Sequence, residues 1–426
     1  MATSISQPDG AAQGLQRKAF IFIVLTGFLS SIGFGIILPV APFLVTRYVS
    51  DPASVGSTLG WLSSVYAICA FIAAPALGAL SDRFGRRPIL LICLFGSAVG
   101  YLCFGLGGAL WMLFLGRIID GLTGGNQGVL FAYIADLVPP KERGKYFGMI
   151  GAVFGIGFIA GPVLGALMAK LSYQAPFYFA AAVTFANVIW GLFFMPESLA
   201  KSQRVERVSL GELNPFSILR GVFAIPQLRW LLIAIFLYSL PFAALQVNLS
   251  LFARDSLHWD ADAIGIIFAI IGITDIFVQG LLLQWLLQRF SEAQIAIAGL
   301  CCELAGYLLI ASVVLFHTPV PLYLGTVIFA IGDGLLGPSL SALLSRSADE
   351  RSQGTVQGGS QSVQSIARIA GPLLGGVLYD GLGYAAPYIA GAGIVGLAIL
   401  AVIVALVALP RSATHGAIED LPASSV

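Results

Sequence analysis

The sequence has little charge, little histidine and no long polar domain. Of its 426 residues 10% are charged, with 22 Lys and Arg against 21 Asp and Glu, and only three are histidine. So few charges cannot cover the surface of a soluble protein of this length. With 58% hydrophobic residues and a mean hydropathy of +0.91, the chain is expected to be surrounded by membrane lipid. The absence of a basic, aromatic-rich face argues against nucleic acid as a partner.

Several motifs of soluble or catalytic proteins are also missing. The five cysteines lie inside apolar stretches, so they indicate neither disulfides nor a metal cluster, and we expect no metal and no cofactor. No Gly-rich loop ending in Lys-Ser or Lys-Thr is present, which argues against ATP-driven transport. No nucleophile stands beside a base, so an intramembrane enzyme is not expected. The polar N-terminal segment lacks the features of a secretion signal, and the first span is therefore expected to be retained.

About twelve apolar stretches are long enough to cross a membrane as helices, which takes about 20 residues each. We therefore predict an all-α integral membrane protein with twelve transmembrane helices. The expected spans are 18–46, 57–80, 88–108, 109–137, 145–169, 174–195, 228–254, 261–288, 294–316, 319–345, 353–379 and 384–409. Lys and Arg are retained on the cytoplasmic side of membranes, and only Arg47, Lys170 and Arg254 fall outside if the N-terminus is inside. Both termini are then cytoplasmic, in the cell (inner) membrane.

A hydrophilic stretch, 197–227, separates six expected spans from six. Short matches relate the two parts at nearly constant spacing: Arg83-Phe84 recurs as Arg289-Phe290, Asp120-Gly121 as Asp333-Gly334, and Gly161-Pro162 as Gly371-Pro372. We predict two pseudo-symmetric six-helix bundles, 18–196 and 228–409, joined by a cytoplasmic linker, with cytoplasmic tails 1–17 and 410–426. Such an arrangement places the substrate path between the bundles, near the bilayer midplane.

Two motifs carry a resemblance to a known family. Residues 78–88, Gly-Ala-Leu-Ser-Asp-Arg-Phe-Gly-Arg-Arg-Pro, resemble the loop signature of the major facilitator superfamily, and residues 157–165 resemble the fifth-helix signature of its antiporters. Further resemblance to the tetracycline-efflux branch of drug:proton antiporters lies in residues 33–42, 132–136, 258–261 and 353–358. The resemblance covers nearly the whole chain and implies the major facilitator fold, with transport coupled to protons.

The charged loop between the second and third spans is expected to act as a cytoplasmic gate. Asp82 ends one helix, Arg86 and Arg87 begin the next, and Asp136 is expected within reach at the end of the fourth span. Partly desolvated ion pairs here would hold the cytoplasmic side closed and break when it opens. The alternative is that these are ordinary cytoplasmic charges. The expected gate residues are Gly78, Asp82, Arg83, Gly85, Arg86, Arg87 and Asp136.

The antiporter motif of the fifth span consists of Gly157, Gly161, Pro162 and Gly165. Small residues let a neighbouring helix approach closely, and Pro162 frees a carbonyl and bends its helix. The motif is either a packing seam alone or a gating element. The two interpretations overlap, because a close seam is also what a rocking motion pivots on.

Six charged residues lie inside the expected spans, where each costs about 2.5–3.5 kcal/mol. They are Arg117, Asp120, Asp275, Glu303, Asp333 and Arg368. Arg117 and Asp120 share a helical face and are expected to pair. The second half has three acids and one arginine, so some acids must be protonated, hydrated or paired with a cationic substrate, as in a proton-coupled carrier. An alternative for Asp333 and Arg368 is a static structural pair.

The resemblance to the tetracycline exporters adds roles for some of these residues. Glu303 takes the place of their ninth-helix Asp and Asp275 that of their eighth-helix His, while Arg117 matches a fourth-helix Arg implicated in proton coupling. The chain also departs from that branch, which has Ala at the place of Asp120 and an acid at the place of Ser30. The missing acid argues against tetracycline itself as the substrate.

Polar and aromatic residues on the helices expected to face the cavity would suit an amphipathic organic molecule, although each alone is equally compatible with a helix-packing hydrogen bond. These residues are Phe34, Tyr66, Asn126, Gln127, Gln246, Asn248, Gln357, Gln361 and Gln364. We predict a monomeric, proton-coupled exporter of hydrophobic or amphipathic organic compounds that works by alternating access. The alternatives are a proton-coupled uptake carrier for a nutrient or metabolite, and a ligand sensor without transport.

Overall fold

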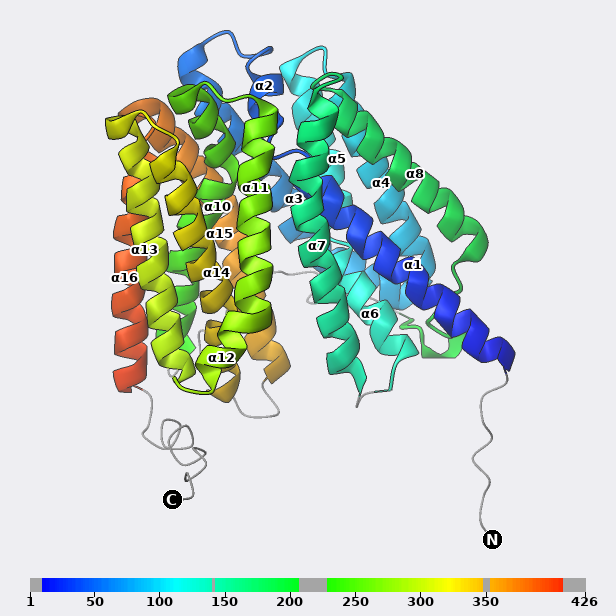
Figure 1. The fold of residues 1–426 in the computed structure, drawn as a ribbon. Coiled ribbons are helices and arrows are strands. Elements are labelled where there is room, and N and C mark those ends of the chain that lie inside the picture. Colours follow the sequence, from blue (N-terminus) through cyan, green and yellow to red (C-terminus); the bar gives the residue numbers. More distant parts are fainter. Residues whose placement is uncertain (1–9, 140–141, 207–227, 348–352, 409–426) are drawn as a thin grey trace, which may run out of the picture. The chain divides into compact units, whose positions relative to one another are not determined.

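The computed structural model describes residues 10–139, 142–206, 228–347 and 353–408, and every regular element in these ranges is a helix (Figure 1). Residues 1–9 of the predicted N-terminal tail, 207–227 of the predicted linker and the whole predicted C-terminal tail lie outside the described residues.

Each of the twelve expected spans corresponds to one helix or to consecutive helices, which confirms the all-α fold class. The first six correspond to α1 (Gly10–Gly35) with α2 (Ala41–Val45), α3 (Val55–Phe84), α4 (Arg86–Leu106), α5 (Leu110–Gly124) with α6 (Gln127–Leu137), α7 (Arg143–Ala169) and α8 (Ala175–Phe194). The last six correspond to α10 (Arg229–Leu257), α11 (Ala261–Phe277) with η5 (Val278–Leu282) and α12 (Leu283–Leu287), α13 (Glu292–Phe316), α14 (Val320–Arg346), α15 (Gln353–Leu382) and α16 (Ala386–Ala408). Short 3-10 turns are η1 (Pro52–Ser54) and η3 (Lys201–Gln203).

Nine helices within the described ranges are long and apolar enough to cross a membrane by themselves. Of the three remaining spans, the first and the fourth have local reasons for falling short. The first span is apolar over Ala19–Gly35 and then turns before α2, which begins at Ala41 and has Pro42 in its first turn. The fourth span is broken at Gly125, between α5 and α6, where glycine lowers the stability of a continuous helix.

The eighth span contains an irregularity that the sequence did not predict. Its middle is a π-helix, η5, inserted between α11 and α12. Such single-turn π-segments are rare and are often found at functional sites. This one begins three residues after Asp275, one of the intramembrane acids.

The chain forms two compact units. The first comprises Met1–Ile37 and Ile68–Asn214, and the second comprises Leu38–Ala67 and Pro215–Val426. The end of the first span, α2 and the first part of α3 therefore belong with the C-terminal helices. The predicted bundles, 18–196 and 228–409, follow the order of the chain, whereas these units follow spatial contacts, and the predicted boundaries stay a prediction.

Glycines allow close helix packing inside both units. In the first unit, α4 and α5 meet where a Cβ on Gly116 would lie 2.7 Å from the carbonyl oxygen of Gly100. In the second unit, α13 and α14 meet where a Cβ on Gly306 would lie 2.9 Å from the carbonyl oxygen of Gly325. Such contacts are typical of helices that associate in lipid, where close packing replaces the hydrophobic effect.

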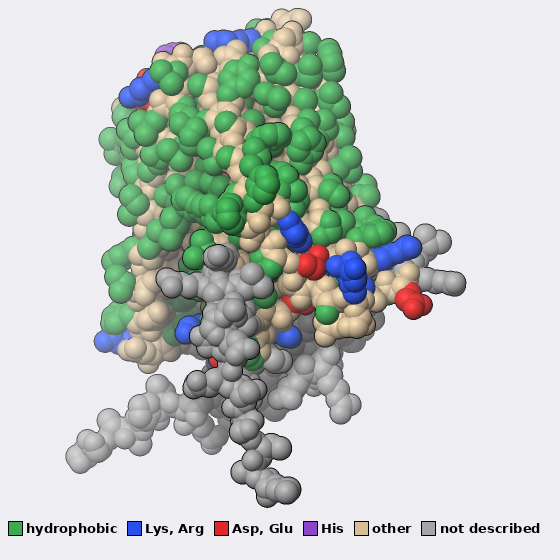
Figure 2. All heavy atoms as spheres, turned by 90° about the vertical axis from the view of Figure 1, so that its right-hand side faces the viewer, with side chains coloured by type: hydrophobic (Ala, Val, Ile, Leu, Met, Phe, Trp, Pro, Cys, Tyr) green, Lys and Arg blue, Asp and Glu red, His purple; other side chains and the backbone are tan. Residues whose placement is uncertain are grey.

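The outer surface of the helices is apolar. Figure 2 shows one face on which hydrophobic side chains cover most of the height, while Lys, Arg, Asp and Glu gather toward its ends. Exposed residues such as Phe95 on α4, and Phe185 and Phe193 on α8, contribute to this apolar surface. A multi-pass membrane protein is expected to have such a surface, because lipid tails surround it.

Candidate functional site

The loop after α3 is shaped by a glycine. Gly85 has φ +107°, a backbone conformation that residues with a side chain rarely adopt, and its amide donates to the carbonyl of Ser81 at 3.0 Å. It separates the last residue of α3 from the first residue of α4. A Cβ at this position would also collide with the carboxylate of Glu197. Two constraints therefore require glycine here.

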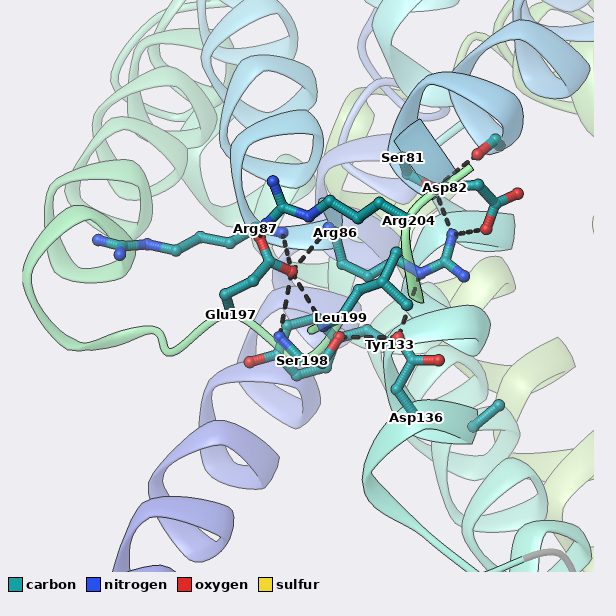
Figure 3. A network of polar contacts seen from close by, with 12 residues as sticks. Ser81, Asp82, Arg86, Arg87, Tyr133, Asp136, Glu197, Ser198, Leu199 and Arg204 are labelled. Carbon is teal, nitrogen blue, oxygen red and sulfur yellow. Dashed lines mark hydrogen bonds and ion pairs between the residues drawn. The ribbon is translucent and has the colours of Figure 1, made fainter. Parts of the chain in front are cut away.

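Arg86 lies at the centre of a polar network (Figure 3). Its Nη1 pairs with Asp82 Oδ1 at 2.6 Å and donates to Ser81 Oγ at 2.6 Å, and its Nε pairs with Asp136 Oδ2 at 3.2 Å. The Arg86 side chain is only 10% exposed. One buried guanidinium thus connects α3, α4 and α6, and the predicted proximity of Asp82, Arg86 and Asp136 is present in the structure.

Glu197, which follows α8, binds the first turn of α4 (Figure 3). Its Oε1 accepts hydrogen bonds from the amides of Arg86 at 2.8 Å, Ser198 at 3.1 Å, Leu199 at 3.2 Å and, more weakly, Arg87 at 3.4 Å. Gly85 has no side chain that could cap α4, so Glu197 satisfies amides that would otherwise lack an acceptor. Its negative charge at a helix N-terminus is also favourable.

The segment after α8 is fixed to this network by further contacts. Glu197 Oε2 pairs with Arg204 Nη2 at 3.5 Å, and Ser198 Oγ donates to Asp136 Oδ2 at 2.9 Å. Tyr133 OH donates to the carbonyl of Pro196 at 2.6 Å. We call this set the loop network: Ser81, Asp82, Arg86, Arg87, Tyr133, Asp136, Glu197, Ser198 and Arg204.

Gly78 and Arg83 lie beside the loop network, and Arg87 has a further contact outside it. The carbonyl of Gly78 accepts a hydrogen bond from Ser81 Oγ at 2.7 Å. The guanidinium of Arg83 lies 5.1 Å from the ring centroid of Phe84. The side chain of Arg87 donates to the carbonyl of Leu192 at the end of α8.

The antiporter motif packs α7 against α1. A Cβ on Gly157 would lie 2.7 Å from the carbonyl of Phe28, and a Cβ on Gly161 would lie 2.8 Å from the Cα of Gly35. Gly165 makes a similar approach to Ile36. The motif therefore forms a close seam inside the first unit. In the second unit Gly371, the counterpart of Gly161, meets the backbone of α10 in the same way, at the carbonyl of Leu240.

Arg117 and Asp120 are buried between α4 and α5. Arg117 Nη1 and Asp120 Oδ2 are 4.0 Å apart, and both side chains are at most 10% exposed. The Arg117 guanidinium also lies 5.2 Å from the ring centroid of Phe104 on α4. The expected pairing is present, and it is directed into the helix interface of the first unit.

The three acids of the second unit surround one turn of α14. Gly332 lies beside Glu303, where an added Cβ would be 3.0 Å from Glu303 Cγ, and Gly334 lies beside Asp275, where it would be 2.8 Å from Asp275 Oδ1. Asp333 lies between these two glycines. We call Asp275, Glu303 and Asp333 the acidic cluster.

The members of the acidic cluster differ in burial and partners. Glu303 is 0% exposed, and neither of its oxygens has a hydrogen-bond partner among the described residues. Asp275 is partly exposed and accepts a hydrogen bond from Gln279 Nε2 at 2.8 Å, next to the π-helix. Arg368 is exposed, and within the described ranges no ion pair joins it to Asp333.

The residues predicted to bind substrate are divided between the two units. Phe34, on α1, stacks on Phe158 of α7 with ring centroids 6.1 Å apart. Asn126 is buried where α6 begins, and Gln127 is exposed. Tyr66, on α3, is half-buried in the second unit.

The other predicted substrate-binding residues of the second unit lie on α10 and α15. Gln357 and Gln361 are exposed, while Gln246 and Gln364 are half-buried. Asn248 is 0% exposed and lies against Gly375. The structure therefore leaves the three α15 glutamines accessible to a ligand and packs Asn248 between helices.

Comparison with known proteins agrees with this fold. The sequence model of the Major Facilitator Superfamily matches residues 23–372 and 231–423. The chain is 36% identical to the class C tetracycline resistance protein of Escherichia coli, over 85% of this chain and 90% of that protein. It is 30% identical to multidrug resistance protein 2 of Bacillus subtilis (strain 168), over 86% and 90%.

A solved transporter structure has a similar fold. The crystal structure of the human organic anion transporter TETRAN is 25% identical in sequence, with a TM-score of 0.67 over 93% of this chain and 100% of that one. The family match extends through both six-span parts of the chain. The chain therefore belongs to the Major Facilitator Superfamily of multi-pass membrane transporters, and within it resembles the tetracycline-efflux branch.

Proposed function

We propose that this chain is a secondary transporter that exports hydrophobic or amphipathic organic compounds in exchange for protons, by alternating access. Similarity to tetracycline and multidrug resistance proteins over most of the chain supports a drug-like substrate. The observation that carries the proton coupling is Glu303, a carboxyl group that is fully buried without a hydrogen-bond partner among the described residues.

Burial determines the protonation state of Glu303. An ionised carboxylate that is buried without a partner is very costly, so the side chain carries a proton in this conformation. Asp333, on this turn of α14, and Asp275, on α11 beside it, are more accessible than Glu303. A proton accepted from water at these acids reaches Glu303 through a short step, and it leaves when a conformational change exposes the cluster to the other side.

The charge balance of the second unit favours a cationic or zwitterionic substrate. Three acids lie inside its spans with one arginine, Arg368, at comparable depth. When these acids are ionised, a cationic group on the substrate neutralises charge that the protein itself leaves unmatched. Substrate and proton then compete for the same negative charge, and this competition produces exchange.

The loop network is the gate in this scheme. It lies at the end of α3, in a basic loop, and the retention of Lys and Arg on the cytoplasmic side supports a cytoplasmic position for it. The contacts of Arg86 with Asp82 and Asp136 tie together three helices of the first unit. A gate of this kind shifts the balance between two conformations, because its contacts form in only one of them.

An efflux measurement in living cells tests the direction and the class of substrate. Cells without their own drug exporters are loaded with ethidium, a lipophilic cation, and fluorescence is followed after re-energisation. We expect the protein to lower cell fluorescence, and we expect a protonophore to abolish the effect. Ethidium uptake instead of loss would contradict export, and efflux that survives the protonophore would contradict proton coupling.

A further inference from the structure

A row of buried polar side chains leads away from Glu303 inside the second unit. Tyr307 follows Glu303 by four residues on α13, so the two side chains lie on one face of that helix. The ring of Tyr307 lies against α16, where a Cβ on Gly391 would be 3.2 Å from it. Tyr388 lies about one turn before Gly391 on α16, which packs beside α13 (Figure 1). Two tyrosines therefore follow Glu303 on two packed helices.

Further contacts continue this row to the end of α10. The ring centroids of Tyr388 and Phe252 are 4.7 Å apart, and Asp255 follows Phe252 by three residues on the same face of α10. Asp255 Oδ1 pairs with Arg254 Nε at 2.7 Å, and its Oδ2 accepts a hydrogen bond from Tyr379 OH of α15 at 2.8 Å. The side chain of Asp255 is 19% exposed. The row thus connects a fully buried carboxyl group with a carboxylate that water reaches.

Tyr388 is the middle member of this row. It interacts electrostatically with Tyr307 on one side and with Tyr379 on the other. We call Tyr307, Tyr388 and Tyr379 the tyrosine row, and all three residues are buried. A tyrosine hydroxyl both donates and accepts hydrogen bonds, so it can pass on one proton while it receives another. A series of such hydroxyls can carry a proton without ionisation of any tyrosine.

The polar atoms at the inner end of the row have no partner in the described part of the protein. Tyr307 OH, Tyr388 OH and both carboxyl oxygens of Glu303 are buried and make no hydrogen bond to any described residue. Unpaired buried polar groups are costly, and proteins commonly satisfy them with internal water, each molecule of which makes about three hydrogen bonds. Four such atoms along one path favour water between them, which bridges the hydroxyls where they do not touch.

Aromatic rings enclose the tyrosine row. Tyr307 meets Phe329 edge to face with ring centroids 5.3 Å apart, and Phe329 in turn stacks on Phe242. Phe252 covers Tyr388 in the same manner. Because apolar surfaces do not hold ordered water, these rings restrict water to the line of the hydroxyls.

The titratable neighbours of Glu303 lie on three helices of the described residues. They are Tyr307 and Cys302 on α13 itself, Asp333 on α14 and Tyr238 on α10, which also interacts with Arg368. Asp333 belongs to the acids that the proposed function uses, and Tyr307 belongs to the tyrosine row. Glu303 therefore lies where two proton routes meet.

We propose that the tyrosine row, together with internal water, is a proton relay between Asp255 and Glu303. A proton from bulk water binds to the Asp255 carboxylate, which passes a proton to the hydroxyl of Tyr379. Each hydroxyl and each water molecule then gives its own proton to the next, through Tyr388 and Tyr307. The last transfer converts the Glu303 carboxylate into the carboxylic acid. No tyrosine changes its charge.

The direction of the relay follows from α10. This helix has 29 residues and is about 44 Å long, enough to cross the hydrocarbon core. With its start on the cytoplasmic side, Asp255 lies on the outer side, from which an exporter takes its protons. The inference rests on the proposed proton coupling. Release of the proton to the other side still requires the conformational change, so the relay alone does not leak protons.

The test follows protonation of Glu303 itself, not transport. The purified protein in lipid nanodiscs receives a rapid pH drop from a photolabile proton donor, and time-resolved infrared spectroscopy records the carbonyl band of the protonated carboxyl group. The band that is missing in Glu303→Gln belongs to Glu303. The key variants are Tyr307→Phe and Tyr388→Phe, which retain the ring and remove the hydroxyl. Tyr384→Phe is the control, because this exposed residue stacks on Tyr379 from outside the row.

A second background separates the two routes to Glu303. The same variants are measured with Asp333→Asn, which removes the route through the other acids. Asp255→Asn, at the accessible end of the relay, is expected to slow protonation in both backgrounds. It decides the matter if the tyrosine variants do not fold.

We expect Tyr307→Phe and Tyr388→Phe to slow the rise of the Glu303 band at least about tenfold, because a positioned proton-transfer group typically contributes about 10²–10⁴-fold. The midpoint of the equilibrium titration of the band is expected to stay unchanged in Tyr388→Phe, whose hydroxyl lies beyond Tyr307. Unchanged rates in both backgrounds, a shifted midpoint in Tyr388→Phe, or equal slowing in Tyr384→Phe would overturn the relay alone. A Glu303 band that does not titrate would overturn the proposed coupling as well.

Discussion

Glu197 has more polar contacts in the loop network than its place in the sequence suggests. In the sequence it begins the hydrophilic stretch after the sixth span, and we predicted only a linker there. In the structure its carboxylate accepts from the first amides of α4 and pairs with Arg204. The signal that could have revealed it is the start of α4, where Gly85 offers no cap and an acceptor must come from elsewhere.

Replacement of Glu197 tests its contribution to the gate. Glu197→Gln retains an oxygen acceptor but removes the negative charge, and charge-assisted hydrogen bonds are worth about 1.5–3 kcal/mol. We expect roughly tenfold slower ethidium efflux at normal membrane abundance, because that much free energy is lost from one of two conformations. Glu206→Gln, an exposed glutamate of the same segment, is the control and is expected to be neutral. Normal efflux by Glu197→Gln would refute the role in gating.

In the proposed function, proton coupling depends on Glu303. Glu303→Gln has nearly the same shape and mimics the protonated side chain permanently. We expect the variant to fold and to bind substrate, with loss of the response of transport to an imposed pH gradient. Glu292→Gln, at the start of the same helix and paired with Arg346 at 2.6 Å, is the matched control and is expected to keep the response. A pH response that persists in Glu303→Gln would exclude Glu303 as the coupling residue.

At the level of helices, the glycines of α7 differ in whether they pack against α1. Gly161 touches the backbone of α1, whereas Gly155 has open space around the position of a Cβ. We expect Gly161→Ala to lower the apparent melting temperature in detergent and Gly155→Ala to leave it nearly unchanged, because overpacking costs about 1–3 kcal/mol. Equal melting temperatures for the two variants would show that the seam is not under steric constraint.

The sequence predicted the helices better than the faces they present. The length of the apolar stretches predicted all twelve spans. Turn residues occur in the sequence near Pro42 and Gly125, but the helix breaks at these points were not predicted. The π-helix after Asp275 was not predicted either; in the structure its first residue, Val278, lies against Gly334 of α14. Asn248, predicted to face substrate, lies against Gly375, because its surroundings are set by residues of another span.

At the scale of the whole molecule, the two parts expected from the order of the chain differ from the two units defined by spatial contacts. Loop motifs and the repeated dipeptides identified the superfamily and the likeness of the two parts of the chain. They could not show that the first part of α3 groups with the C-terminal helices, since contacts such as Gly60 with Pro372 join residues far apart in the chain. Motifs identify a family because they are local, whereas the contacts that open and close a transporter are not.

The central claim is that transport of an organic compound is coupled to protons through the acidic cluster. The most direct test uses the purified protein in proteoliposomes, with a pH gradient imposed in the absence of any other energy source. We predict ethidium accumulation on the acidic side that stops when nigericin with potassium on both sides removes the gradient, and that is absent with Glu303→Gln but not with Glu292→Gln. Accumulation that is indifferent to the pH gradient would contradict the account.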